Sequence, residues 1–305
     1  MDAPRLQQLL RFVSLVLAGH GKYTVGAVAF AAHTGSPSLL VRPAHGPRPS
    51  SLAHRPSPMP GYLVKQECIA IDGAADLTIR SLLDRQQFSD PLGLAAGLGI
   101  SAAAWPLFGL LWPSGTLLAA AMAKRKLRDG ERVLELGCGL ALASLVAHRR
   151  GVDITASDCH PLAAAFLREN LRLNGLPAMK YRHGRWGDAL PSAGQLDQAA
   201  DTDVRGCFDL IIGSDLLYER DDAGLLAAFI GRHSAPSGEV WIVDPERGNR
   251  SAFNRRMALL GFARTEQRLD RPVSETSPAY KGRLMVFCRS VGLLPPGALQ
   301  VFTGA

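Results

Sequence analysis

The sequence lacks the cysteine and hydrophobic patterns of disulfide-rich, zinc-binding and membrane proteins. Its five cysteines are odd in number, widely spaced and never arranged as C-x-x-C, so we expect reduced thiols. No uninterrupted apolar run reaches the ~18 residues that a membrane-spanning helix needs, so we expect no membrane contact. No Ser-His-Asp or Cys-His nucleophile arrangement is apparent, and His148, His160 and His183 match no metal-ligand spacing, which predicts surface or capping histidines and no metal site.

Acidic residues are scarce in the first 60 residues, which carry six basic side chains and one acidic side chain. This segment therefore holds +5 of the net charge of +7 and leaves a nearly neutral body, which argues against nucleic-acid binding. Its eight prolines predict a poorly ordered leader over residues 1–60. The reduced cysteines favour a cytoplasmic protein, while the basic, acid-poor leader leaves a mitochondrial transit peptide open.

Beyond the leader, residues 61–110 predict a β-hairpin around Asp72-Gly73 and a lead-in segment, and residues 111–305 predict one α/β domain. Strands that alternate with helices imply a parallel sheet with helices on both faces. A polar insertion, 187–206, interrupts the alternation. The predicted strands are 131–136, 153–157, 179–183, 208–213 and 239–244, and the predicted helices are 116–126, 141–150, 161–174, 221–232 and 249–260.

The most informative stretch is a buried strand that breaks into a glycine turn and then a helix. Glu135 lies in the strand, and Gly137-Cys138-Gly139 forms a turn that a ligand can approach closely. Leu142 stands where the dinucleotide-binding pattern G-x-G-x-x-G has its third glycine, so that pattern is incomplete. A turn without a ligand is the alternative interpretation of this motif taken alone.

Polar residues follow two further strands, where ligands of open α/β sheets bind. Asp158 lies 21 residues after Gly137, close to the ~20-residue spacing at which an acidic residue meets ribose hydroxyls. Ser214, Asp215 and Tyr218 follow the strand 208–213 and can converge on one target atom. For both aspartates the alternative is a role as a helix N-cap, and for Tyr218 it is packing at the edge.

Two tryptophans are candidate walls for a cofactor. Trp112 precedes the helix predicted from residue 116, and Trp186 follows the strand 179–183 in Trp186-Gly187-Asp188. An indole in either place can lie beside an adenine, and Asp188 can accept from the adenine amino group. Core packing is an equally strong interpretation of each tryptophan.

Together these motifs resemble the S-adenosylmethionine-dependent methyltransferases of family 16, which includes calmodulin-lysine and electron-transfer-flavoprotein β-subunit lysine methyltransferases. The resemblance spans roughly residues 61–290, and its most specific part is the D-x-x-Y pattern of Asp215 and Tyr218. It implies a Rossmann-like class I fold with a seven-stranded, mostly parallel sheet and an antiparallel C-terminal strand. The matching segments are Val133–Gly139, Thr155–Asp158, Glu169–Gly175, Trp186–Asp188 and Ser214–Tyr218.

The resemblance also implies roles for the candidate residues. Glu135 and the turn Gly137-Cys138-Gly139 would surround the amino-acid end of S-adenosyl-L-methionine, and Asp158 would hold the ribose. The cofactor's adenine would lie beside Trp186, the family's tryptophan segment would contribute Trp112, and the sulfonium would lie near Ser214. Asp215 and Tyr218 would act at the mouth through which a lysine enters. The turn 244–249 would line the substrate side.

The resemblance implies a methyltransferase that acts on a lysine of a protein substrate. We expect it to work as a monomer and to bind no nucleic acid. A small-molecule N-methyltransferase, an NAD(P)-dependent oxidoreductase and an inactive S-adenosylmethionine-binding scaffold remain alternatives. Methyltransferases that act on adenine or glutamine usually show Asn/Asp-Pro-Pro-Tyr after this strand, where the present chain has Ser214-Asp-Leu-Leu.

Overall fold

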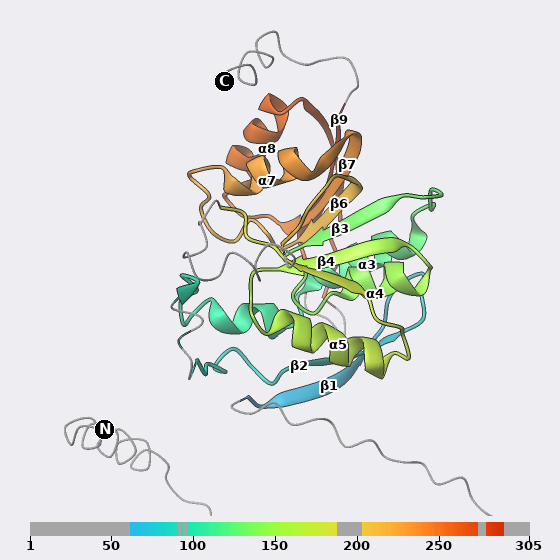
Figure 1. Ribbon diagram of the computed structural model, residues 1–305, viewed down its shortest axis with the longest axis vertical. Helices are drawn as coiled ribbons and strands as arrows, with labels where there is room; N and C mark the ends of the chain where they lie inside the picture. Colours follow the sequence, from blue (N-terminus) through green and yellow to red (C-terminus); the bar gives the residue numbers. More distant parts are fainter. Residues whose placement is uncertain (1–61, 91–92, 94–96, 188–202, 274–278, 290–305) are drawn as a thin grey trace, which may run out of the picture. The chain divides into compact units, whose positions relative to one another are not determined.

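The computed structural model describes residues 62–90, 93, 97–187, 203–273 and 279–289 (Figure 1). The leader 1–60, Asp188 and most of the polar insertion 187–206 lie outside the described residues. The elements in chain order are β1 (Val64–Ile69), β2 (Leu77–Leu82), η1 (Trp105–Gly109), α3 (Pro113–Lys124), β3 (Arg132–Leu136), α4 (Leu142–Arg149), β4 (Asp153–Asp158), α5 (Ala163–Leu173), β5 (Lys180–His183), β6 (Phe208–Ser214), α7 (Leu225–His233), β7 (Ser234–Pro245), α8 (Arg250–Leu259), β8 (Phe262–Arg268) and β9 (Gly282–Arg289).

Seven strands form one sheet in the order β5-β4-β3-β6-β7-β9-β8. Strands β3 to β7 pair in parallel, whereas β9 is antiparallel to both of its neighbours, β7 and β8. This order, with one antiparallel strand inserted next to the edge, is that of the class I methyltransferase fold. The predicted fold class is therefore confirmed, including the antiparallel C-terminal strand.

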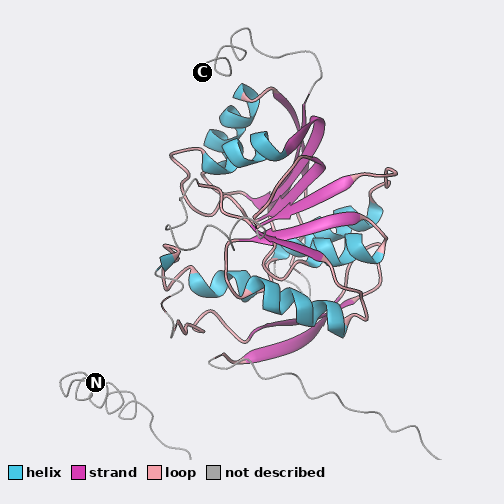
Figure 2. Ribbon diagram, in the orientation of Figure 1, coloured by secondary structure: helices cyan, strands magenta, loops and turns pink. Residues whose placement is uncertain are grey.

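Side chains that alternate along the strands build a hydrophobic core on each face of the sheet. On β3, Val133 packs into the core under α3, α4 and α5, and its neighbour Leu134 packs into the core under α7 and α8. Figure 2 shows these two helical layers on opposite sides of the central strands. The carboxyl ends of β3, β4 and β6 meet at one edge, which carries the candidate site.

The predicted β-hairpin is confirmed as a separate two-stranded sheet that docks on α5. Asn174 accepts a hydrogen bond from the Thr78 N–H at 3.0 Å and donates one to its carbonyl oxygen at 2.8 Å. Asn170 accepts from the Arg80 N–H at 2.8 Å. These side-chain amides substitute for a third strand, so β2 lies buried against the domain.

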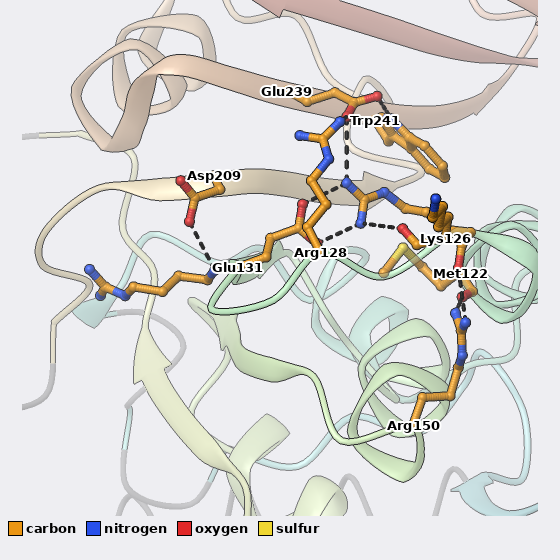
Figure 3. A network of polar contacts seen from close by, with 10 residues as sticks. Met122, Lys126, Arg128, Glu131, Arg150, Asp209, Glu239 and Trp241 are labelled. Carbon is orange, nitrogen blue, oxygen red and sulfur yellow. Dashed lines mark hydrogen bonds and ion pairs between the residues drawn. The ribbon is translucent and has the colours of Figure 1, made fainter.

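A network of ion pairs ties the opposite edge of the sheet to α3 (Figure 3). The buried Arg125 guanidinium donates to both carboxylate oxygens of Glu131 at 2.6 Å, and it lies 3.5 Å from Glu239. The Arg128 guanidinium and the Trp241 indole N–H also donate hydrogen bonds to the Glu239 carboxylate. A buried ion pair fixes geometry more than it adds stability, so we assign this edge a structural role.

Two element starts differ from the predictions by four or five residues, for local reasons. Helix α7 begins at Leu225 rather than 221, because the Asp221 carboxylate accepts from the N–H groups of Leu225 and Leu226 at 2.8 and 3.0 Å. Strand β7 begins at Ser234 rather than 239, because Phe208 pairs with Ser234 before the register shifts.

Candidate active site

The glycine turn between β3 and α4 is a tight left-handed bend. Gly137 and Gly139 have φ angles of +55° and +50°, and Ala141 follows with φ 60°. A Cβ on Gly139 would lie 2.7 Å from the Phe108 carbonyl oxygen, so only glycine fits there. Cys138 between them is buried, and its N–H donates to the Ser157 carbonyl at 2.9 Å. The turn is thus held against both η1 and β4.

Glu135 points from β3 into the start of α4. Its Oε2 accepts hydrogen bonds from the Ser144 N–H at 2.9 Å and from the Ser144 hydroxyl. Burial raises the pKa of this carboxyl to about 7, although both Ser144 hydrogen bonds oppose the shift. Glu135 therefore fixes the first turn of the helix on which the glycine turn depends.

Asp158 ends β4 and binds back to the glycine turn. Its Oδ2 accepts from the Gly139 N–H at 2.8 Å, and its Oδ1 accepts from the His160 N–H at 2.8 Å. Burial raises its pKa, and these backbone donors oppose the shift. The N-cap residue of α5 is Leu162, and none of the hydrogen bonds of Asp158 goes to this helix, so the N-cap alternative does not describe Asp158. The Cys159 N–H also donates to the carboxylate, and these three donors leave lone-pair capacity for a further donor.

Asp215 lies just beyond β6 on a left-handed backbone with φ 57°, an unusual conformation for a residue other than glycine. Its N–H donates to the Val243 carbonyl at 3.0 Å, and Arg247 lies 2.8 Å from its Oδ1. Burial raises the pKa of Asp215, and Ser114 and Arg247 oppose that shift. Asp221 caps α7, so the N-cap alternative does not describe Asp215 either.

Tyr218 and Trp186 lie on the same cavity. This cavity has a volume of about 410 Å³, and Leu216, Leu217 and Leu225 also line it. Tyr218 is 48% exposed, and burial of the rest of its ring raises its pKa to about 12, so its phenol stays protonated at neutral pH. The structure thus brings these two predicted residues together beside the loop that holds Asp215.

Trp112 belongs to a different part of the edge. It is the N-cap residue of α3, its indole N–H donates to the Leu107 carbonyl at 2.9 Å, and the Arg85 guanidinium lies 5.1 Å from its ring centre. Trp112 is not among the residues that line the cavity of Trp186. It positions α3, whose Ser114 and Gly115 lie beside Asp215 and Ser214.

His160 differs from the prediction of a surface or capping histidine. Its Nδ1 does accept from the Leu162 N–H at 3.2 Å, which is a capping contact, but the ring is buried. It stacks on Phe108 with ring centres 3.7 Å apart, and burial lowers its pKa to about 3. The surface expectation was wrong because the aromatic partners come from η1, some 50 residues earlier in the chain.

Three polar residues near Asp215 were not among the predicted catalytic or cofactor-binding residues. Ser114 and Tyr280 share a hydrogen bond of 2.9 Å, and Asp244 is fully buried. The sequence signal for Asp244 is its position at the carboxyl end of β7, the next strand after β6. No periodicity could indicate Tyr280, which lies in the loop before β9.

S-adenosylmethionine fits the residues at this edge. Asp158 keeps acceptor lone pairs for ribose hydroxyls, the glycine turn removes side chains beside it, and no cation neutralises Asp158 among its hydrogen-bond partners in the described part of the chain. These acceptor oxygens suit the hydroxyls of a neutral diol and the ammonium of an amino-acid end better than a pyrophosphate, which needs positive charge or free N–H groups.

The comparison with known families decides between these ligands. Residues 107–257 match the lysine methyltransferase family. The matched segment contains all ten predicted catalytic and cofactor-binding residues, from Trp112 to Tyr218. The resemblance inferred from the sequence is therefore confirmed.

Part of this chain is also similar to individual lysine methyltransferases and to a histone-arginine methyltransferase. An electron transfer flavoprotein beta subunit lysine methyltransferase from Xenopus laevis is 27% identical over 150 residues, 48% of this chain and 55% of the relative. The protein N-lysine methyltransferase METTL21A of Danio rerio is 30% identical over 124 residues, 40% of this chain and 50% of the relative. The histone-arginine methyltransferase METTL23 of Homo sapiens is 25% identical over 142 residues, 43% of this chain and 67% of the relative.

This chain spans about half the length of the first two relatives. Among known structures, a Thermus thermophilus 16S rRNA methyltransferase aligns with a TM-score of 0.46 and 16% identity, over 76% of this chain and 52% of the other. We assign the fold class from the strand order and not from this likeness.

Proposed function

We propose that this protein transfers a methyl group from S-adenosylmethionine to a lysine side chain of a protein acceptor. The observation that carries the proposal is the placement of Asp215, a partly buried carboxylate on a left-handed backbone at the sheet edge that Asp158 and the glycine turn also occupy. The matches to lysine methyltransferases support the choice of acceptor.

Each predicted residue has a role that its geometry allows. The Asp158 carboxylate accepts the ribose hydroxyls, Trp186 lies beside the adenine, and Ser214 lies near the sulfonium. The glycine turn and Glu135 hold the amino-acid end, and Trp112 fixes α3 against them. When bound, S-adenosylmethionine supplies an electrophilic methyl group.

Asp215 and Tyr218 handle the acceptor. Lysine has an unperturbed pKa of about 10.4, so its ammonium must lose a proton to water or to a nearby carboxylate before the nitrogen can attack. Asp215 attracts and orients the ammonium, and the phenol of Tyr218 closes the channel and helps to exclude water. No covalent protein nucleophile is needed.

The proposal extends to the setting in which the enzyme works. No helix of the described residues is long and apolar enough to cross a membrane. We propose a cytoplasmic enzyme that acts as a monomer on a protein and does not bind nucleic acid. All five cysteines are free thiols, which suits a reducing compartment. Imaging of the full chain with and without residues 1–60 tests this location against the mitochondrial alternative.

Two measurements test the proposed activity. Calorimetry should show micromolar binding of S-adenosylmethionine and S-adenosylhomocysteine, and no binding would refute it. Incubation with a lysate and labelled S-adenosylmethionine, followed by mass spectrometry of the labelled protein, should identify a methylated lysine. Label on a small molecule or on arginine would reject the lysine acceptor while it keeps the methyltransferase.

A matched pair of variants tests the role of Asp215. Asp215→Asn should keep cofactor binding but lower the rate of methylation at least about tenfold, because the ammonium loses its counter-charge. Asp270→Asn removes an exposed carboxylate outside the cavity, which pairs with Arg268 at 2.7 Å, and should leave the rate unchanged. An undiminished rate in Asp215→Asn would refute the role.

A further inference from the structure

Arg247 lies between two carboxylates at the carboxyl ends of β6 and β7. Its Nη2 is 2.8 Å from Asp215 Oδ1, and its Nη1 is 3.7 Å from Asp244 Oδ1. Nη1 also donates to the Asp215 carbonyl oxygen at 3.4 Å. The guanidinium therefore makes a close ion pair with Asp215 and a loose one with Asp244.

Asp244 is the less satisfied of the two carboxylates. Its side chain has no exposed surface, and neither of its oxygens has a hydrogen-bond partner of good geometry among the described residues. Burial raises its pKa to about 6, against the opposing effects of Arg247, of the more distant Arg250 and of the Leu217 N–H. Burying a carboxylate without a close donor is costly, so Asp244 is poised to accept one.

Asp215 and Asp244 share one close cation. Among the described residues, Arg247 alone lies within ion-pair distance of either carboxylate, and Arg250 acts on Asp244 from farther away. The Oδ2 atom of Asp215 lacks a hydrogen-bond partner of good geometry among the described residues. Asp215 can therefore pair with a second cation, and the proposed acceptor, a lysine ammonium, is such a cation.

An ammonium and a guanidinium compete for Asp215 if Arg247 stays in place. Two cations on one carboxylate repel each other, while the buried Asp244 remains unmatched. A movement of about 1 Å would bring Arg247 Nη1 from its present distance to ordinary ion-pair contact with Asp244. The Arg247 side chain is 28% exposed, which leaves it room to turn.

We propose that Asp244 is a positioning residue that receives the Arg247 guanidinium when a cationic acceptor takes its place on Asp215. Each cation then has its own carboxylate, and Asp215 turns from Arg247 to the acceptor. This inference rests on the proposed function for the identity of the acceptor, but the exchange itself depends only on the three charged groups and needs no cofactor.

The test uses n-butylammonium as a mimic of the lysine side chain and the full chain as the protein. Nuclear magnetic resonance of the arginine Nε–H groups, with the Arg247 signal assigned from the Arg247→Lys spectrum, reports both the affinity and the state of Arg247. In the wild type, n-butylammonium should bind and shift the Arg247 signal. Asp244→Asn keeps the shape of the side chain but should weaken n-butylammonium binding about tenfold or more.

Glu246→Gln is the matched control, because Glu246 lies two residues away and pairs with Arg268 and Arg283 instead. It should leave the affinity for n-butylammonium within about twofold of the wild type. A crystal structure of the wild type with n-butylammonium provides a second measurement that does not depend on the folding of a variant. It should show Arg247 in contact with Asp244 and the ammonium on Asp215.

Three results would overturn the exchange: no binding of n-butylammonium to the wild type, equal loss of affinity in Asp244→Asn and Glu246→Gln, or a complex in which Arg247 keeps its contact with Asp215. If Asp244 had only a structural role, its replacement would change stability, and the Arg247 signal would not move when n-butylammonium is added. Failure of the proposed function shows separately, as absent binding of S-adenosylmethionine in calorimetry.

Discussion

Glu135 and Ser144 are joined across the glycine turn, because one carboxylate oxygen of Glu135 accepts from both the backbone N–H and the hydroxyl of Ser144. The carboxylate lies at the end of β3 and the serine in the first turn of α4. This pair sets the angle at which the helix leaves the strand, and so the shape of the turn between them.

Replacing Glu135 by Gln should make stability less dependent on pH. The folded pKa of about 7 is raised above the unfolded value, so the wild type has its full stability below about pH 4 and loses it as pH rises through 7. Gln keeps an acceptor for Ser144 but cannot ionise. Urea titrations at pH 5 and pH 8 should show Glu135→Gln gaining on the wild type by up to about 3 kcal/mol. Parallel curves for the two proteins would contradict this assignment.

Alanine at Gly139 should destabilise the fold and abolish cofactor binding. The variant suffers both a left-handed φ of +50° and a Cβ only 2.7 Å from the Phe108 carbonyl oxygen. Gly151→Ala is the control, since Gly151 has φ +81° with open space around its Cβ position. Thermal unfolding should show a loss of about 1 kcal/mol in Gly151→Ala and a clearly larger loss in Gly139→Ala. Equal losses in the two variants would mean that η1 moves away and makes room for the added Cβ.

Asn at Asp158 should weaken S-adenosylmethionine binding about tenfold or more, because one carboxylate oxygen becomes an NH₂ donor that faces a backbone N–H. Asp153→Asn is its control at the other end of β4, where the carboxylate pairs with Lys180 at 2.7 Å on the surface. Calorimetry on both variants should separate them. Unchanged affinity in Asp158→Asn would remove Asp158 from the site.

Phenylalanine at His160 should protect the protein against mild acid. The folded pKa of about 3 lies below the unfolded value of about 6.5, so the wild type loses stability as pH falls below 6.5 while its unfolded chain takes up a proton. Phe keeps a ring against Phe108 and Trp105. Between pH 7.5 and pH 5, the wild type should lose about 2 kcal/mol relative to His160→Phe. An imidazole that titrates near 6.5 in the folded state would show the burial to be wrong.

The fold could be predicted because its signals are local. The short apolar run of Val133 to Leu136, the glycines that follow and the helix-forming residues after them are close together in the sequence. The same logic located the ends of β4 and β6, and thus Asp158 and Asp215. Element boundaries were less accurate where a side chain from a loop decides them, as Asp221 does at α7.

The sequence by itself determined the class of fold, the edge that carries the site and the residue types placed there, because strand periodicity and turn chemistry are short-range properties. Only the tertiary structure decided what those residues contact. It buried His160 against η1, brought Tyr280 to Ser114 across 166 positions, and placed Arg247 between Asp215 and Asp244. Ion pairing and burial depend on distances between segments far apart in the chain, and no local pattern encodes those distances.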